Sequence, residues 1–243
     1  MGKEIIRIEN VSKRYGKKIV LDDVSITINK GETVALIGSS GTGKTTLFNI
    51  ITNTVNPDSG HVYIDEKEVM TYNNKTLAKK LGIMTQRFDL VNELSVINNV
   101  LAGRLSDWSF IKSLISLFYP MDKPIAEKAL KRVELLDKMY DKTANLSGGE
   151  QQRVALARLL VQHPQIILAD EPIASLDPAL SESVISMLIN LTSEYNITLV
   201  SSLHSVDYAL RFFDRIIGLK EGKVYIDSST SDINEDKLKE LYK

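Results

Sequence analysis

Cysteine is absent from this sequence of 243 residues. The chain can therefore form neither a disulfide framework nor a thiolate metal site, which fits a reducing compartment such as the cytosol. An excess of basic residues is also lacking, because the formal net charge is −1. Since binding to nucleic acid usually requires such an excess, we expect no nucleic-acid partner.

Long apolar runs are missing too. The first eight residues are charged early and lack the apolar core of a signal peptide. The longest apolar candidate, 110–120, is interrupted by Lys112 and falls short of the roughly 20 residues that a membrane-spanning helix needs. We therefore expect that the chain itself does not cross a membrane.

The most informative stretch is Gly38–Thr45, which reads Gly-Ser-Ser-Gly-Thr-Gly-Lys-Thr. It fits the phosphate-binding pattern of Gly, four residues and Gly-Lys-Ser/Thr. The apolar run 33–37 before it predicts a buried strand, and 46–51 after it predicts a helix. In that context the loop N–H groups and the helix N-terminus favour an anion. Lys44 would then reach the β- and γ-phosphates, and the Thr45 hydroxyl would bind Mg²⁺.

A second apolar run, Gln165–Pro172, ends in two carboxylates. Continuous apolar runs are typical of strands in parallel sheets. An acid at the end of such a strand, across from a phosphate loop, suits Mg²⁺, and Asp170 has that position. Glu171 beside it is placed to polarise an attacking water. The alternative is an ordinary capped strand end.

The rest of the chain predicts a single α/β domain with a helical insertion. We find no internal repeat and no low-complexity linker. Alternating residues at 5–8, 19–28 and 61–65 predict antiparallel strands, runs at 81–86 and 197–202 predict buried strands, and 216–227 predicts a hairpin. Helical spacing appears at 98–105, 124–138 and 180–191, and the tail from Ser228 is polar and helical with few apolar anchors.

The run Leu146–Arg153 opens another helix. Ser147 suits the N-cap, and Glu150 three residues later completes a capping box. Two glycines, Gly148 and Gly149, nevertheless weaken a helix start. They favour a second interpretation, in which the helix N-terminus approaches something closely, such as a phosphate.

Three single residues are weaker signals. Tyr15 precedes a turn and is either a stacking platform for a nucleotide base or an ordinary strand-end tyrosine. Gln86 ends a short buried strand and points either to a ligand crevice or to solvent. His204, just past an apolar strand, either donates a hydrogen bond to a γ-phosphate or is structural.

Aromatic residues gather between Asp107 and Pro120. Trp108, Phe110, Phe118 and Tyr119 are either local core under a loop or a docking surface for a partner helix.

Taken together, these stretches resemble the ATP-binding-cassette (ABC) ATPases over essentially the whole chain. The Leu-Ser-Gly-Gly-Glu-Gln-Gln run at 146–152 is the distinguishing mark, and 175–177 follows in the family's order. The resemblance implies an α/β P-loop NTPase fold with an antiparallel β subdomain and an inserted α-helical subdomain. It implies one ABC ATPase domain over 1–243, with the core in 1–86 and 161–243 and the helical subdomain at about 87–160.

The resemblance implies ATP and Mg²⁺ as cofactors and gives roles to individual residues. Glu171 is the general base, His204 the γ-phosphate sensor and Lys44 the third catalytic residue. The resemblance assigns the metal contacts to Thr45, Gln86 and Asp170, and it implies that Gln86 also senses a permease. The residues assigned to nucleotide are Tyr15, Gly38, Ser39, Ser40, Gly41, Thr42, Gly43, Lys44, Thr45, Thr46, Gln86, Ser147, Gly149 and Asp170.

In this family Ser147 and Gly149 bind the ATP held by a second copy, so the resemblance implies a head-to-tail homodimer. A closer likeness, in 99–105, 108–118, 169–178, 203–209 and 215–219, is to the phosphonate importer ATPases. It implies an ATPase at the cytoplasmic face of the membrane, with two permease subunits and a solute-binding protein. The alternatives are an ATPase for lipid extraction or efflux, or a soluble ATP switch.

Overall fold

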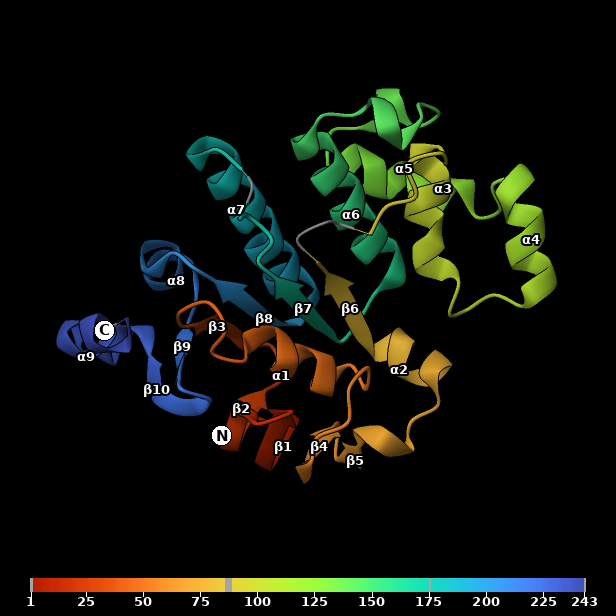
Figure 1. Cartoon of the computed structure of the whole chain (residues 1–243). Helices are drawn as coiled ribbons and strands as arrows, with labels where there is room; N and C mark the ends of the chain where they lie inside the picture. Colours follow the sequence, from red (N-terminus) through yellow and green to blue (C-terminus); the bar gives the residue numbers. More distant parts are fainter. Residues whose placement is uncertain (1, 86–88, 175, 243) are drawn as a thin grey trace.

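The fold is described from a computed structural model that covers residues 2–85, 89–174 and 176–242 (Figure 1). A mostly parallel sheet lies at its centre, with strands in the order β10-β9-β3-β8-β7-β6. β10 pairs antiparallel with β9, and the other described strand pairs of this sheet are parallel. The strands are β3 (Thr33–Ile37), β6 (Leu81–Met84), β7 (Ile166–Asp170), β8 (Thr198–Leu203), β9 (Arg215–Lys220) and β10 (Lys223–Ser229).

The central strands are buried because both faces of the sheet are covered. Every residue of β3 and of β8 is buried, as the unbroken apolar runs predict. The strand expected at 33–37 is confirmed. Parallel register aligns the carboxyl ends of these strands, since Ile37 pairs with Leu203 and Asp170 pairs with Ser202.

A second, antiparallel sheet packs below α1 in the view of Figure 1. Its order is β2-β1-β4-β5, with β1 (Glu4–Tyr15), β2 (Lys18–Asn29), β4 (Ser59–Ile64) and β5 (Lys67–Glu68). The first strand is longer than the expected 5–8. The pairing shifts register between Ile8 and Val11, where Asn10 has a φ of 48°. This irregularity interrupts the alternation, so the sequence pattern ended the strand too early.

Helices α3, α4, α5 and α6 gather beside β6, at the right of Figure 1. The helices are α1 (Lys44–Ile51), α2 (Asn74–Lys80), α3 (Val96–Leu101), α4 (Phe110–Phe118), α5 (Lys123–Arg132), α6 (Gly148–Gln162), α7 (Pro178–Tyr195), α8 (Val206–Phe212) and α9 (Glu235–Leu241). The helix expected at 124–138 ends at Arg132 because Glu134 has a φ of 57°, which no α-helix accommodates.

Two buried clusters hold these layers together. One fills the space between the antiparallel sheet, α1 and the near face of the central sheet, and includes Ile6, Leu36 and Phe48. The other joins the opposite face to α6, α7 and the helical insertion, and includes Ala35 and Leu156. Among the described residues, no helix combines the length and apolarity that crossing a bilayer demands.

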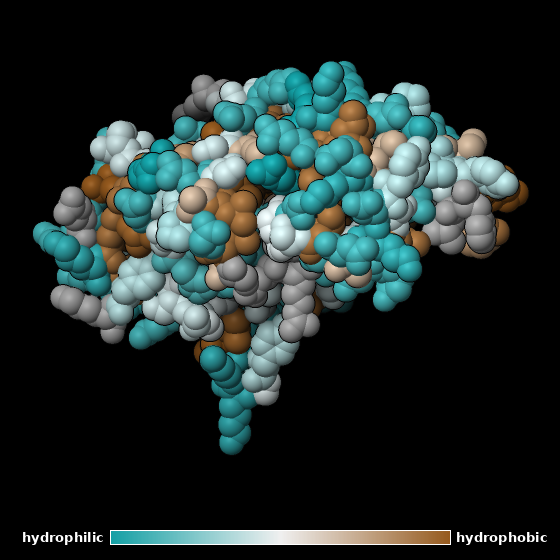
Figure 2. Space-filling view, turned by 90° about the horizontal axis from the view of Figure 1, so that it is seen from above, coloured by the Kyte–Doolittle hydropathy of each residue, from teal (hydrophilic) through white to brown (hydrophobic). Residues whose placement is uncertain are grey.

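The aromatic residues before and within α4 were predicted to be either local core or a docking surface, and the structure shows both buried and exposed ones. Trp108 is buried, and its Nε1 donates to Asp122 Oδ2 at 3.0 Å, so it is local core. Phe110 and Tyr119 are 83% and 76% exposed. In Figure 2 hydrophobic residues reach the surface at the right-hand end of the molecule, where α4 lies in Figure 1. The side chain of Phe118 lies outside the described part.

Candidate functional site

The loop Gly38–Thr45 joins β3 to α1, as the sequence predicts. Gly38 has a φ of 148°, and a Cβ there would lie 2.4 Å from the carbonyl oxygen of Leu219. Gly43 has a φ of 105°, and a Cβ there would lie 2.7 Å from the carbonyl oxygen of Val20. Both positions therefore need glycine, because the loop backbone lies against neighbouring strands.

Lys44, the first residue of α1, is buried under this loop. Its Nζ donates to the carbonyl oxygens of Gly38 at 2.8 Å and Ser39 at 3.2 Å. Burial lowers the pKa of the Lys44 ammonium, and the nearby carboxylates of Glu171 and Asp170 oppose that shift. The structure thus brings the lysine of the loop and the two carboxylates of β7 to one edge of the sheet.

Ser202, at the end of β8, holds the carboxylate of Asp170 and the backbone of Glu171. Its Oγ donates to Asp170 Oδ1 at 2.6 Å, and it accepts from the backbone N–H of Glu171 at 2.9 Å. Ser202 was not among the residues predicted from the sequence. The sequence does show a polar side chain within this apolar strand. The structure then places it at the register position opposite Asp170.

Glu171 and His204 face one another beyond these strand ends. The Nε2 atom of His204 lies 2.5 Å from Oε1 of Glu171. Glu171 has a φ of 50°, a conformation that is unfavourable outside glycine and is concentrated at functional sites. Both side chains line a cavity of about 210 Å³. A carboxylate held by an imidazole next to a buried ammonium suits transfer of a proton from water.

Tyr15 is half-exposed at the end of β1, where it pairs with Lys18 across the hairpin. This hairpin lies beside the loop, because a Cβ on Gly41 would be 3.9 Å from Lys18 Nζ. Lys18 was not predicted as a site residue, because its charge reaches the loop through the fold and not through a sequence motif.

The other predicted loop residues have varied surroundings. Ser40 and Thr45 are exposed, and Thr46 is partly buried. The Thr42 hydroxyl donates to the carbonyl oxygen of Ser39 at 2.9 Å. Gln86, predicted as a nucleotide and metal contact, lies outside the described residues.

The capping box predicted at the start of α6 is present. Ser147 Oγ accepts from the backbone N–H of Glu150 at 3.4 Å, and Glu150 Oε2 accepts from the backbone N–H of Ser147 at 2.8 Å. The hydrogen-bonded ion pair with Lys138, together with the hydrogen bonds that the backbone N–H and the hydroxyl of Ser147 donate to the carboxylate, lowers the pKa of Glu150 to about 2. The helix N-terminus is therefore fixed by its own side chains.

The two glycines of α6 have different surroundings. A Cβ on Gly148 would meet nothing within 4 Å, whereas one on Gly149 would lie 2.6 Å from Leu180 Cδ2. Within this chain the close neighbour of Gly149 is thus the start of α7. Ser147 and both glycines line a surface hollow of about 610 Å³ whose other described lining residues come from 134–138, 150–153 and 176–180.

A family model described as "ABC transporter" matches residues 21–174. The chain belongs to this family. Its similarity to other members extends beyond the matched part. A phosphonates import ATP-binding protein of Mesoplasma florum is 43% identical over 98% of this chain and 99% of its own length. The corresponding proteins of Halalkalibacterium halodurans and a Nostoc species are 41% and 43% identical over 98% of this chain and cover 94% and 91% of their own lengths.

Solved ABC transporter structures share the fold. An ATP-binding cassette in its ADP conformation is 30% identical with a TM-score of 0.81, over 97% of this chain and 93% of its own. A dimeric bacterial ABC transporter cassette is 34% identical with a TM-score of 0.78, over 93% of this chain and 99% of its own. The P-loop NTPase fold class expected from the sequence is confirmed.

Proposed function

We propose that this chain is the ATP-hydrolysing subunit of an ABC importer that energises uptake of phosphonate or a related phosphorus oxyanion. The convergence of Lys44, Asp170 and the Glu171–His204 pair at one sheet edge carries the ATPase part of this proposal. The substrate class rests on the relatives, which are named phosphonates import ATP-binding proteins at 41–43% identity. The comparisons do not favour lipid extraction, efflux or a soluble switch.

In this proposal the loop 38–46 holds the phosphates of ATP, and Tyr15 stacks on the base. Lys44 gives up its bonds to two loop carbonyl oxygens and turns its charge to the β- and γ-phosphates. Thr45 and Asp170 offer the hard oxygen ligands that suit Mg²⁺, and Ser202 holds one oxygen of that carboxylate. The metal neutralises phosphate charge when bound. We also assign Gln86 to this group.

Hydrolysis follows from the position of Glu171. Its carboxylate accepts a proton from water as the water oxygen attacks the γ-phosphorus, and the bond from that phosphorus to the bridging oxygen of ADP breaks. The Nε2 atom of His204 lies 2.5 Å from Oε1 of Glu171, and we propose that it donates to a γ-phosphate oxygen instead when ATP binds. If His204 exchanges the Glu171 carboxylate for a γ-phosphate oxygen, the site becomes sensitive to whether the γ-phosphate is present.

We propose that the working unit is a homodimer. The start of α6 is fixed by its capping box and opens into the 610 Å³ hollow, and Ser147 and Gly148 are exposed there. In a head-to-tail pair this helix N-terminus, with Ser147 and Gly149, would contact the ATP held by the other copy. The dimeric cassette among the solved relatives supports a homodimer.

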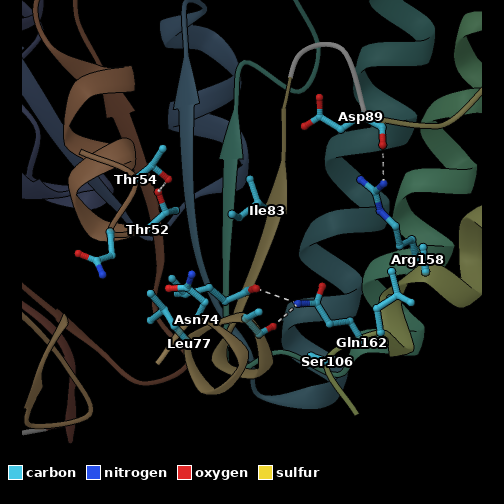
Figure 3. A pocket seen from close by; sticks show the side chains of 15 residues that line it. Thr52, Thr54, Asn74, Leu77, Ile83, Asp89, Ser106, Arg158 and Gln162 are labelled. Carbon is cyan, nitrogen blue, oxygen red and sulfur yellow. Dashed lines mark hydrogen bonds between the residues drawn. The ribbon is translucent and has the colours of Figure 1, made fainter. Parts of the chain in front are cut away.

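A groove of about 680 Å³ is our candidate for the permease contact (Figure 3). Its walls come from the end of α1, from α2, from β6 and from the turn after α3, and α6 supplies Arg158 and Gln162. Gln162 Nε2 ties the end of α6 to the end of α2 and the start of β6 by donating to the carbonyl oxygens of Ala78 at 2.7 Å and Leu81 at 2.8 Å. Leu105 lies on the rim and is half-exposed, so apolar surface continues toward α4.

The groove therefore lies between the core and the helical insertion. We assign 1–86 and 161–243 to the core and about 87–160 to the helical insertion. A permease segment seated there would sense movement of one part against the other. We propose that the chain acts peripherally at the cytoplasmic face of the membrane, with two permease subunits and a solute-binding protein; the importer names of its relatives support this.

The test is growth of a deletion strain on a phosphonate as sole phosphorus source. We expect wild type to restore growth and Glu171→Gln not to restore it, at matched protein levels. Growth of the deletion strain without complementation, in a background lacking other phosphonate importers, would show that the substrate class is wrong.

A further inference from the structure

Gln152 lies on α6, one turn after Gly148, and is fully buried. Its Nε2 donates to the carbonyl oxygen of Pro172, the residue that follows Glu171. Because proline has no backbone N–H, its carbonyl oxygen is the main-chain group through which a hydrogen bond can hold it. Gln152 therefore ties the turn that carries Glu171 to α6.

The backbone of Glu171 is held from both sides. On its amino side, its N–H donates to Ser202 Oγ at 2.9 Å. On its carboxyl side, Pro172 is buried and hydrogen-bonded to Gln152. The φ of 50° at Glu171 is unfavourable for a non-glycine residue, and it departs from the extended backbone that a following proline favours. Such a conformation persists only where the surrounding structure imposes it, and these two hydrogen bonds do so on either side of the carboxylate.

The orientation of the Gln152 amide follows from its partner. A carbonyl oxygen only accepts hydrogen bonds, so the NH₂ group has to face Pro172. The other end of the amide, Oε1, is then buried and has no hydrogen-bond partner among the described residues. An unpaired buried amide oxygen is unfavourable, and a methionine of similar length would fill the space without one. Packing alone therefore does not account for glutamine at this position, whereas the bond to Pro172 does.

We propose that Gln152 is a positioning residue for hydrolysis, which holds the turn at 171–172 so that the Glu171 carboxylate is set to accept a proton from water. This inference rests on the proposed role of Glu171 as the general base. Gln152 acts on the base and not on the phosphate loop at 38–45. The rate of hydrolysis therefore depends on Gln152, and the affinity for nucleotide does not.

The test uses the full chain with Gln152→Met, which keeps the length of the side chain and removes the donor. Gln152→Leu removes the donor with a different shape, and it answers the same question if the methionine variant does not fold. Gln151→Met is the matched control. The Nε2 atom of Gln151 also donates from α6 to backbone carbonyl oxygens, but to those of Thr143 and Leu146 in the helical insertion, both at 3.3 Å.

Three measurements separate positioning from a general loss of structure. Single-turnover hydrolysis of labelled MgATP gives the rate of the chemical step. Calorimetric titration gives Kd for MgADP and for a non-hydrolysable ATP analogue, and thermal unfolding confirms that each variant folds. The double variant with Glu171→Gln shows whether Gln152 acts through Glu171.

We expect Gln152→Met to lower the hydrolysis rate by about tenfold to a hundredfold and to leave both Kd values within about twofold of wild type, because the base is displaced and the phosphate loop is not. Gln151→Met should match wild type. In the Glu171→Gln background, Gln152→Met should lower the residual rate by no more than about twofold, because the base that it positions is already gone.

A wild-type rate in Gln152→Met, an equal loss in Gln151→Met, or an undiminished further loss in the Glu171→Gln background overturns the role of Gln152 and leaves the proposed function standing. Wild-type turnover in Glu171→Gln alone overturns the assignment of the general base, and the role of Gln152 with it.

Discussion

The imidazole of His204 and the carboxylate of Glu171 form a close pair, with 2.5 Å between Nε2 and Oε1. They come from the ends of two neighbouring parallel strands, β8 and β7, whose register brings them together. In this arrangement one carboxylate oxygen is already engaged by His204. We therefore predict that Glu171 is the proton acceptor and that His204 exchanges this carboxylate for a γ-phosphate oxygen when ATP binds.

Replacing Glu171 with Gln keeps the size of the side chain and removes its basicity. We expect nucleotide affinity within about twofold of wild type and kcat reduced by about 10² or more, as for loss of a general base. Because ATP then persists, the variant should accumulate as a dimer in MgATP, which size-exclusion chromatography with light scattering detects. Normal turnover would show that another group accepts the proton.

Replacing His204 with Ala removes the imidazole while leaving the carboxylate. We expect kcat to fall by roughly 10²-fold with little change in KM, because the lost donor acts mainly on charge that develops at the γ-phosphate. His61→Ala is the matched control, since His61 also contacts a glutamate, Glu68, at 2.7 Å but lies in the antiparallel sheet. Equal losses in the two variants would contradict a role for His204 in the reaction.

Replacing Ser202 with Ala frees one oxygen of Asp170 and leaves the backbone N–H of Glu171 without its acceptor. Partners of this kind typically change metal affinity by about 10–100-fold. We expect the Mg²⁺ concentration for half-maximal ATPase activity to rise by at least about tenfold. Ser201→Ala is the control, because the Ser201 hydroxyl has no hydrogen-bond partner among the described residues. An unchanged Mg²⁺ dependence would contradict the metal role of Asp170.

The pKa of Glu150, lowered to about 2, predicts a pH-dependent stability. A carboxylate with a depressed folded-state pKa stabilises the fold fully above its unfolded pKa, near 4.5, and loses that contribution as pH falls toward 2. We expect Glu150→Gln to cost about 1 kcal/mol at pH 7, with the difference from wild type shrinking below pH 5.

Urea unfolding at several pH values measures this difference. The control is Glu127→Gln, which removes an exposed i,i+4 ion pair with Lys123 and should change the free energy of unfolding by about 0.5 kcal/mol or less. A constant difference between Glu150→Gln and wild type from pH 7 to pH 3 would contradict the capping role of the carboxylate.

The sequence predicted the central strands and the phosphate loop because local patterns specify them. β3, β7 and β8 are apolar runs, and the loop has fixed spacing. It did not predict the full length of β1, whose pairing shifts register, or the end of α5, where Glu134 leaves the helical region. Both depend on backbone conformations that residue patterns do not encode.

At the site, the predicted Lys44, Asp170, Glu171 and His204 lie together. Ser202 and Lys18 were missed, because their importance comes from strand register and from packing between distant parts of the chain. The roles of Ser147 and Gly149 depend on a second copy and stay predictions, as does that of Gln86.

Uptake of a labelled alkylphosphonate by cells tests the account most directly. The deletion strain would carry wild type, Glu171→Gln or the His61→Ala control at equal levels. We predict rapid uptake with wild type and with the control, and none above background with Glu171→Gln. Equal uptake with wild type and Glu171→Gln would contradict the claim that hydrolysis at this site drives phosphonate import.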